Sequence, residues 1–247
     1  MGYILGSLRL FLIFLIASIM IAIYSVLIIF IRHTDEKGFK LRRIFLILMM
    51  DLIGFRIKKE GNPVVQPALY VCNHKGVFDF FVVLRYINAF VVSKSEMSKL
   101  PVISKGAAYS GIIYVNREDQ KSRSVVRDAI RETLLSGRNV LIFPEGTTHS
   151  GRTTMEFKMG SFVEAARHGI PVVPIALEYK DKNDYYVDIP ALKMYFRSFG
   201  KLRTTCSISY GTPITDADPA ALAGRTKKWI DQKLLEFQNE FGHSYKD

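Results

Sequence analysis

Cysteine is scarce in this chain of 247 residues, which holds only two. Cys72 and Cys206 each stand in an apolar, strand-like run, and neither has the spacing of a metal ligand. We therefore expect no disulfide framework and no metal site, and we expect both thiols to be buried and reduced. Internal repeats and low-complexity tracts are also lacking in the sequence.

Acidic residues are in deficit, with 23 Asp and Glu against 34 Lys and Arg, and the net charge is +11. Such a charge predicts an anionic partner: a phospholipid surface, a phosphorylated substrate or nucleic acid. The basic residues are spread along the chain without a recognisable nucleic-acid motif, so we expect no nucleic acid. Hydrophobic residues make up 49%, which fits a globular core with an additional membrane-facing surface.

Charge is entirely absent from residues 10–31, a run of 22 residues near the N-terminus. As a helix this run would be about 33 Å long, enough to cross a hydrocarbon core. A cleaved signal peptide is disfavoured, because the run is too long for one and no small-x-small cleavage site follows it. A buried helix of a soluble protein is a weaker alternative.

Positive charge is more abundant after this run than before it, where Arg9 is the only basic side chain. The basic residues that follow it are Arg32, Lys37, Lys40, Arg42 and Arg43. The distribution of positive charge predicts a protein of the cell membrane with most of the chain on the cytoplasmic face.

Residues 44–55 form a second apolar stretch, which is too short to span a membrane and carries Asp51. An interfacial or re-entrant helix paired with the first, and a helix packed on the soluble core, both fit this pattern. We predict that residues 1–55 are membrane-anchoring helices, a spanning or re-entrant pair, and that residues 56–247 form the main domain.

Apolar patterning alternates between strands and helices through the main domain. We expect strands at 55–61, 68–73, 88–94, 139–144, 170–179 and 203–211, and helices at 77–87, 119–136, 161–169 and from Pro219 onward. This order predicts an α/β fold, a mixed and largely parallel sheet flanked by helices, with an N-terminal membrane-associated helical segment. Chemistry in such folds collects in the loops beyond the strand ends.

One of these strand ends reads LYVCNHKGVFDF, with His74 at the tip and Asp79 five residues later. Histidine can accept a proton from an alcohol near neutral pH, and a carboxylate can fix its tautomer and stabilise the imidazolium that forms. A serine nucleophile is unnecessary if the substrate supplies its own hydroxyl. The alternative is a strand-end histidine beside a helix-capping aspartate, and the stretch alone leaves both open.

Three other stretches stand out. In GIIYVNR, the guanidinium of Arg117 suits phosphate, although a surface arginine after a turn would look the same. In FPEGTTHSGR, Gly146 and Thr147 would let backbone N–H groups approach an anion, whereas Glu145 could hold a substrate hydroxyl or a basic neighbour. In VPIAL, Pro174 inside a buried strand marks an edge, a bulge or the wall of a site.

The order of these motifs, NHxxxxD, GxxYxxR, FPEGT and VPIAL, resembles the four motif blocks of the glycerolipid acyltransferase family, the lysophosphatidate acyltransferases. SKSEMSKLP, residues 93–101, is similar to the family's lysine-x-glutamate stretch, and FKMG is similar to its FKxG. The resemblance covers roughly residues 70–178, and the apolar N-terminus is also typical of the family.

The resemblance implies that residues 56–247 are an acyltransferase catalytic domain. The reaction it implies moves an acyl chain from acyl-CoA or acyl carrier protein to the sn-2 hydroxyl of lysophosphatidate, giving phosphatidate for phospholipid biosynthesis, with no cofactor. His74 would be the general base, oriented by Asp79. The substrate-binding residues that it implies are Arg117, Glu145, Gly146, Thr147, Lys94, Lys158 and Gly111.

Two positions depart from the family's pattern. Tyr114 replaces a phenylalanine, which is conservative, and Thr148 replaces the arginine that usually follows FPEGT. Arg152 or Lys158 could supply the missing charge. Another lyso-lipid acceptor, with a head group or of the ornithine type, is therefore the alternative substrate. A remote alternative is a basic, membrane-bound binding module without catalysis.

Overall fold

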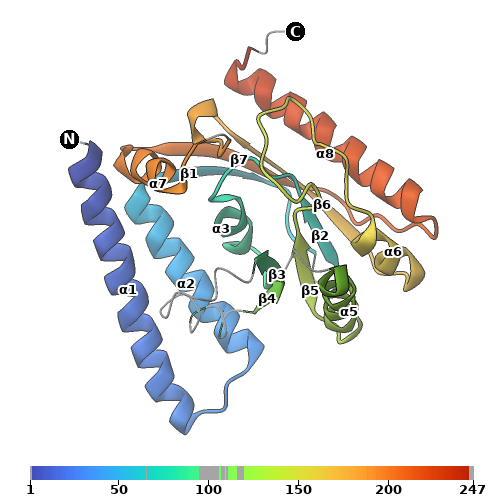
Figure 1. Ribbon diagram of the computed structural model, residues 1–247, viewed down its shortest axis with the longest axis horizontal. Coiled ribbons are helices and arrows are strands. Elements are labelled where there is room, and N and C mark those ends of the chain that lie inside the picture. Colours follow the sequence, from blue (N-terminus) through green and yellow to red (C-terminus); the bar gives the residue numbers. More distant parts are fainter. Residues whose placement is uncertain are drawn as a thin grey trace.

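The structure is a computed structural model that describes residues 2–64, 66–94, 106, 109, 111–115, 120–187 and 189–244. Its centre is a sheet whose seven described strands run in the order β1-β7-β6-β2-β5-β3-β4 (Figure 1). All neighbouring strands are parallel except β6 and β7, which are antiparallel. The strands are β1 Phe55–Glu60, β2 Leu69–Cys72, β3 Ala89–Lys94, β4 Ile112–Val115, β5 Asn139–Ile142, β6 Val172–Tyr179 and β7 Thr204–Tyr210.

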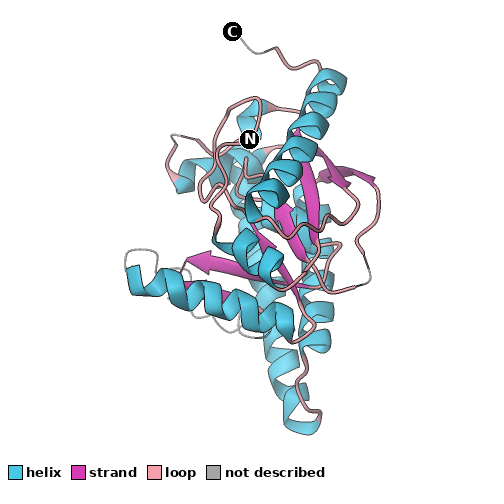
Figure 2. Ribbon diagram, turned by 90° about the vertical axis from the view of Figure 1, so that its right-hand side faces the viewer, coloured by secondary structure: helices cyan, strands magenta, loops and turns pink. Residues whose placement is uncertain are grey.

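Helices cover both faces of this sheet (Figure 2), which confirms the predicted fold class. The helices are α1 Gly2–Phe30, α2 Asp35–Ile53, α3 Asp79–Leu84, α5 Gln120–Leu135, α6 Gly160–Arg167, α7 Ala191–Gly200 and α8 Pro219–Phe241, with a short 3₁₀ helix η2 at Lys182–Asp184. As expected from the sequence, Asp218 caps α8 by accepting hydrogen bonds from two N–H groups of its first turn.

Strand β2 explains why the central strands are apolar at every position. Leu69 and Val71 pack into the core beneath α5, α6 and α8, whereas Tyr70 and Cys72 pack into the opposite core with α2 and α3. A strand covered on both faces needs apolar side chains in both directions. Cys72 is a free, buried thiol, and so is Cys206 on β7, as predicted.

Pro174 lies on the central strand β6, at the point where its pairing with β7 is disturbed. The β7 ladder ends at the pair Ile175 and Tyr210, and an isolated bridge then joins Val172 to Ile214. The partner chain therefore advances one residue more than β6 between these two pairs, which is a bulge. Of the three predicted settings for this proline, the pairing matches the bulge.

Helix α1 is the one described helix that is long and apolar enough to cross a membrane. Its first turns pack against α7, and the Arg9 guanidinium donates 2.9 Å to the carbonyl of Phe199. Helix α2 differs from the prediction, since it is a 19-residue helix that begins at Asp35 and not a short one from residue 44. Its early start follows from Thr34, whose hydroxyl accepts the N–H of Lys37.

One strand and one α-helix were not predicted from the sequence, and neither was the short η2. Strand β4 lies within GIIYVNR, and helix α7 follows the turn-rich stretch before Pro190. Helix α7 has only 10 residues, and a helix this short depends on the surfaces it packs against. Its partner is α1, almost two hundred residues earlier in the chain.

Candidate active site

His74 and Asp79 form a hydrogen-bonded pair at the carboxyl end of β2. His74 Nδ1 lies 2.8 Å from Asp79 Oδ2, the carboxylate is fully buried, and the imidazole is 24% exposed. Because Nδ1 faces the carboxylate, a neutral His74 carries its proton there and its lone pair on Nε2. No described residue hydrogen-bonds to Nε2, so this atom is available to a ligand.

The carboxylate of Asp79 is held by three further donors. Its Oδ2 atom accepts the backbone N–H groups of Lys75 at 2.6 Å and Gly76 at 2.8 Å, while Oδ1 accepts the Tyr179 hydroxyl at 2.7 Å. Burial, followed by the charge of Asp79, raises the pKa of Tyr179 well above its usual value, so this hydroxyl remains a donor. These contacts fix the orientation of the carboxylate.

Asn73 fastens the strand end that carries the histidine. Its buried amide donates 2.8 Å to the carbonyl of Leu177 and accepts the N–H of the same residue at 2.8 Å. The side chain thereby imitates a backbone pairing with β6 just where β2 ends. His74 consequently leaves the sheet from a fixed point.

Glu145 joins the histidine loop to the FPEGT turn. One carboxylate oxygen accepts the backbone N–H of His74 at 2.8 Å, and the other accepts the N–H of Met155 at 2.8 Å. Only 4% of Glu145 is exposed, so the carboxylate lies beneath the turn and away from solvent. Its visible role is to clamp two loops through their backbone N–H groups.

His149 lies on the far side of the same carboxylate. Its Nδ1 accepts the N–H of Gly151 at 3.1 Å, which leaves the proton of the neutral ring on Nε2. Nε2 is 2.5 Å from Glu145 Oε2, although the two are not aligned as a hydrogen bond. The backbone N–H of His149 also reaches the carbonyl of His74 at 3.4 Å. The loop after FPEGT therefore packs directly on the histidine loop.

Gly146, Thr147 and Lys158 form the outer part of the FPEGT turn. Gly146 has a φ of +75°, and a Cβ atom there would meet the Lys158 side chain, with its Cε at 2.8 Å. The Lys158 ammonium therefore lies over Gly146, and Lys158 itself is exposed. Thr147 is exposed and its N–H makes no hydrogen bond within the described residues. The turn presents a cation and a free N–H at its surface.

Thr148 points back into the protein. Its hydroxyl donates to the carbonyl of Tyr186, in the segment that follows η2. The same segment is tied to the histidine loop, because the N–H of Tyr186 donates 2.8 Å to the carbonyl of Lys75. The position that usually holds an arginine is thus used here for a contact within the chain.

The His74–Asp79 pair, here called the dyad, lies with Glu145 and the FPEGT turn in one region of the sequence that matches a known family. A family model described as Acyltransferase matches residues 55–178, just over half of the chain. The chain belongs to the acyltransferase family. The matched region runs from β1 through β6 and contains both the His74–Asp79 pair and Glu145.

The names of the curated relatives specify different acceptor lipids. The chain is 29% identical over 130 residues to a 1-acyl-sn-glycerol-3-phosphate acyltransferase of Neisseria gonorrhoeae, which covers 53% of this chain and 51% of the relative. It is 30% identical over 141 residues to a lyso-ornithine lipid O-acyltransferase of Pseudomonas aeruginosa, covering 57% of this chain and 54% of the relative. The chain thus spans about half the length of these relatives.

A solved structure shares the fold of the whole acyltransferase chain. The crystal structure of the 1-acyl-sn-glycerophosphate acyltransferase PlsC of Thermotoga maritima superposes with a TM-score of 0.69 at 19% identity. The superposition covers 100% of both chains, so it includes the N-terminal helices as well as the sheet.

Among the predicted binding residues, Gly111 lies apart from this geometry, and Lys94 and Arg117 are described only in part or not at all. Gly111, with a φ of +73°, precedes β4, and a Cβ atom there would lie 2.7 Å from the ring of Phe39 on α2. Lys94 ends β3 as the partner of Val115, and its side chain is outside the described part of the acyltransferase. Arg117 lies outside the described residues altogether.

Lys75 is an unexpected buried cation beside the dyad. It is fully buried, its ammonium donates to the carbonyl of Gly151, and it lies 5.2 Å from the centre of the Tyr185 ring. Burial lowers the pKa of Lys75, against the opposing effect of nearby carboxylates led by Glu178. Lys75 thereby connects the histidine loop to the loop after FPEGT.

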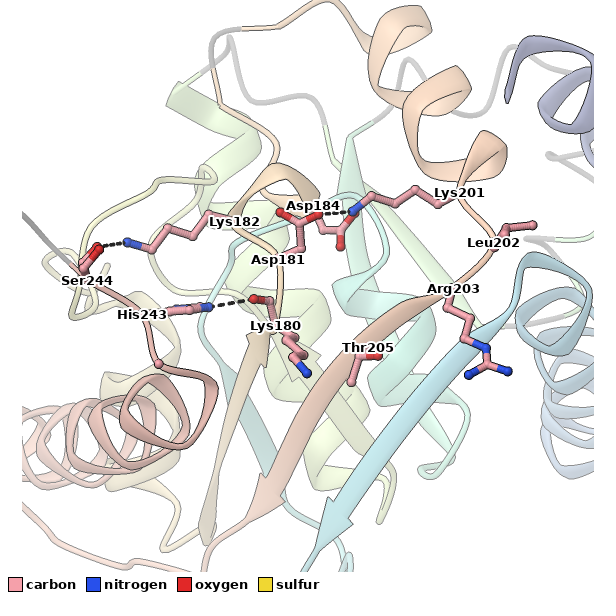
Figure 3. A pocket seen from close by; sticks show the side chains of 11 residues that line it. Lys180, Asp181, Lys182, Asp184, Lys201, Leu202, Arg203, Thr205, His243 and Ser244 are labelled. Atoms are coloured by element: carbon pink, nitrogen blue, oxygen red, sulfur yellow. Dashed lines mark hydrogen bonds and ion pairs between the residues drawn. The ribbon is translucent and has the colours of Figure 1, made fainter. Parts of the chain in front are cut away.

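A cavity of about 830 Å³ opens elsewhere on the acyltransferase, between the ends of β6 and α8 and the start of β7 (Figure 3). Neither His74 nor Asp79 lines it. Basic and acidic side chains surround it, among them Lys180, Asp181 and Arg203. The cavity is a feature separate from the dyad.

Proposed function

We propose that the protein transfers an acyl chain from an acyl thioester, acyl-CoA or acyl carrier protein, to the sn-2 hydroxyl of lysophosphatidate, forming phosphatidate. The observation that carries this proposal is the His74–Asp79 pair, whose Nδ1 contact is 2.8 Å and whose Nε2 atom has no partner among the described residues. This geometry provides a general base.

In the proposed reaction, His74 Nε2 takes the proton of the acceptor hydroxyl as its oxygen attacks the thioester carbonyl. The carbon–sulfur bond then breaks, and the imidazolium returns the proton to the departing thiolate. Asp79 stabilises the imidazolium and keeps Nε2 directed at the substrate. No acyl-enzyme intermediate is formed.

The negative oxygen of the tetrahedral intermediate needs donors from the protein. The backbone N–H groups of His74 and Gly146 already donate to Glu145 and Phe143. The free N–H of Thr147 and the ammonium of Lys158 are the donors that the FPEGT turn offers. Lys158, with Arg117 and Lys94, is also the proposed contact for the acceptor phosphate.

Helix α1 supports a site of action at the cell membrane. Its outward face is mostly apolar, with exposed apolar side chains from Tyr3 and Ile4 to Ile29 and Phe30. A lipid acceptor and a long acyl chain would reach the site from the bilayer without crossing water. We place the domain on the cytoplasmic face, from the distribution of basic residues around α1.

Thr148 favours a second candidate, an acyltransferase acting on a lyso-lipid other than lysophosphatidate. Its hydroxyl is engaged by the carbonyl of Tyr186, so this position offers no charge to an acceptor phosphate. A head-group lysophospholipid or an ornithine-type lyso-lipid would not require that charge.

The test incubates the detergent-purified protein with lysophosphatidate and either acyl-CoA or acyl carrier protein, and identifies the product by mass spectrometry. We expect phosphatidate from the wild type, turnover reduced by at least about a hundredfold in His74→Ala, and normal turnover in the matched control His168→Ala, at the exposed residue that follows α6. Near-normal turnover in His74→Ala would overturn the mechanism.

A panel of lyso-lipid acceptors with one donor separates the two candidates. Preference for lysophosphatidate supports the first, and preference for an acceptor without a phosphate monoester supports the second. Absence of acyl transfer to every acceptor would leave the binding module as the better account.

A further inference from the structure

The cavity between β6, β7 and the end of α8, here called the β6–β7 pocket, is divided from the dyad by the segment around η2. One side of this segment contacts the histidine loop through Tyr186 and Lys75, at 2.8 Å. The other side carries Asp181 and Asp184, which line the pocket. The pocket is broadly open to solvent, so a ligand could reach it from the surface.

Some of the charged side chains in the β6–β7 pocket form ion pairs or hydrogen bonds with other residues of the chain. The Lys201 ammonium lies 2.6 Å from Asp181 and 2.7 Å from Asp184, so these three charges form the wall of the pocket. The Lys182 ammonium donates to the carbonyl of Ser244 (Figure 3). The acidic side chains of the pocket are therefore engaged by a lysine at its rim.

Lys180 and Arg203 are different, because both side chains are exposed and neither side chain makes a hydrogen bond or ion pair within the described part of the chain. The N–H of Lys180 donates 2.9 Å to the carbonyl of Thr205, and Arg203 precedes Thr205 by two residues. Figure 3 shows Lys180 and Thr205 side by side and Arg203 farther along the same rim, with its guanidinium extended away from Lys180. They present two cations and a hydroxyl, which is the chemistry that binds phosphate oxygens.

A further cation lies beside this group. Arg56 on β1 is the register partner of Thr205 and is exposed. Paired residues of neighbouring strands project to the same face of a sheet. Arg56 therefore extends the basic surface from β6 across β7 to β1.

The β6–β7 pocket also borders the membrane helix. Leu202, next to Arg203, is 76% exposed, and the Arg9 guanidinium of α1 donates to the carbonyl of Lys201. An exposed leucine beside unpaired cations suits the boundary between lipid tails and head groups.

We propose that the β6–β7 pocket is a second, non-catalytic site that binds a phosphate-bearing ligand through Lys180 and Arg203. The ligand chemistry is a phosphate ester, supplied by an anionic lipid head group or by a soluble phosphate compound. The proposal does not depend on the acyl-transfer reaction.

The test titrates the full chain in non-ionic detergent with three ligands: dihexanoyl phosphatidylglycerol, zwitterionic dihexanoyl phosphatidylcholine and sodium phosphate. Isothermal titration calorimetry compares the wild type with K180Q/R203Q. The matched control is R167Q/K228Q, which removes two exposed charges from α6 and α8 outside the pocket.

We expect phosphatidylglycerol to bind the wild type and the control alike, and to bind K180Q/R203Q at least about tenfold more weakly. A loss confined to phosphatidylglycerol identifies the lipid head group as the source, whereas an equal loss for sodium phosphate identifies phosphate itself. Unchanged binding in K180Q/R203Q, or a loss matched by the control, would overturn the proposal. Acyl transfer depends on the dyad and not on the pocket, so the turnover of K180Q/R203Q should stay normal.

Discussion

Asp79 is the residue on which most contacts of the site converge. Its two oxygens accept hydrogen bonds from His74, Lys75, Gly76 and Tyr179 at 2.6–2.8 Å. A carboxylate held by this many donors is oriented before any substrate arrives.

Substitution of Asp79 separates orientation from charge. In Asp79→Asn, the amide oxygen can still accept from His74, Lys75 and Gly76, while the NH₂ group meets the Tyr179 hydroxyl. We expect a folded protein whose kcat falls by about two to four orders of magnitude. Initial rates and a thermal melt measure the two effects. A large loss of stability with proportionate loss of rate would contradict this division of roles.

Tyr179→Phe is the milder companion variant. It removes one donor from Asp79 Oδ1 and should lower the free energy of unfolding by about 1–3 kcal/mol, because a buried acceptor is left without its partner.

Lys75 predicts a dependence of stability on alkaline pH. Because burial lowers the pKa of the folded-state lysine, the unfolded chain holds more protons between that lowered pKa and the ordinary value of 10.5. The stability contribution of Lys75 therefore rises as pH rises through this window. Denaturant titrations of the wild type and Lys75→Met from neutral to alkaline pH should reveal a difference that shifts in favour of the wild type. A difference independent of pH would contradict the prediction.

The spacing of five residues between His74 and Asp79, together with the resemblance of the four motifs to the acyltransferase family, was sufficient to predict that these two residues pair. It was insufficient for Tyr179, which reaches Asp79 across one hundred residues. Asn73, Lys75 and His149 stand next to or inside the motifs, but their partners lie on other strands and loops. Proximity to a motif in the sequence indicates that a residue belongs to the site, but it does not indicate which residues that side chain contacts.

At the scale of elements, α1 and α2 form a hairpin whose two ends meet the same part of the domain. Tyr3 near the start of α1 packs against Phe196 of α7, with ring centres 5.8 Å apart. Gly54, directly after α2, accepts the N–H of Thr204 at 3.2 Å. If α1 crossed the bilayer, Tyr3 and the domain would lie on opposite sides of the membrane, and the contact between Tyr3 and Phe196 could not form. This geometry therefore favours a re-entrant pair of helices.

A cysteine introduced near the N-terminus tests this arrangement. Ser7 is exposed on α1, and both native cysteines are buried, so Ser7→Cys should be the main reactive thiol. We expect a membrane-impermeant maleimide to label it from the same side of the membrane as Lys228→Cys, a control on the domain. Labelling of the two positions from opposite sides would establish a transverse span.

Elements were predictable where their signal was local. The buried strands have continuous apolar runs, and α8 begins at an Asp-Pro pair, so their positions followed from the sequence. Helix α7 has a signal that depends on tertiary contact, since its helical form relies on burial against α1. Helix α2 was underestimated because its charged first half hides an apolar face that includes Phe39 and Leu46.

For the whole molecule, the net charge of +11 should influence how anionic donors arrive. We expect kcat/KM for acyl-CoA to fall by about three- to tenfold as ionic strength rises from about 0.01 M to about 0.3 M, because screening shortens the range of attraction. An uncharged N-acetylcysteamine thioester is the matched donor and should be little affected. Equal salt dependence for both donors would exclude electrostatic attraction of the donor.

The contact between Arg9 and the carbonyl of Lys201 joins positions 192 residues apart. During synthesis, α1 leaves the ribosome long before α7 exists, and β1 must likewise wait for its partner β7. The first helix therefore spends most of translation without its protein partner and with its apolar surface uncovered. Early capture of that helix by the bilayer would protect it from aggregation and hold the nascent chain where the last segments close the fold.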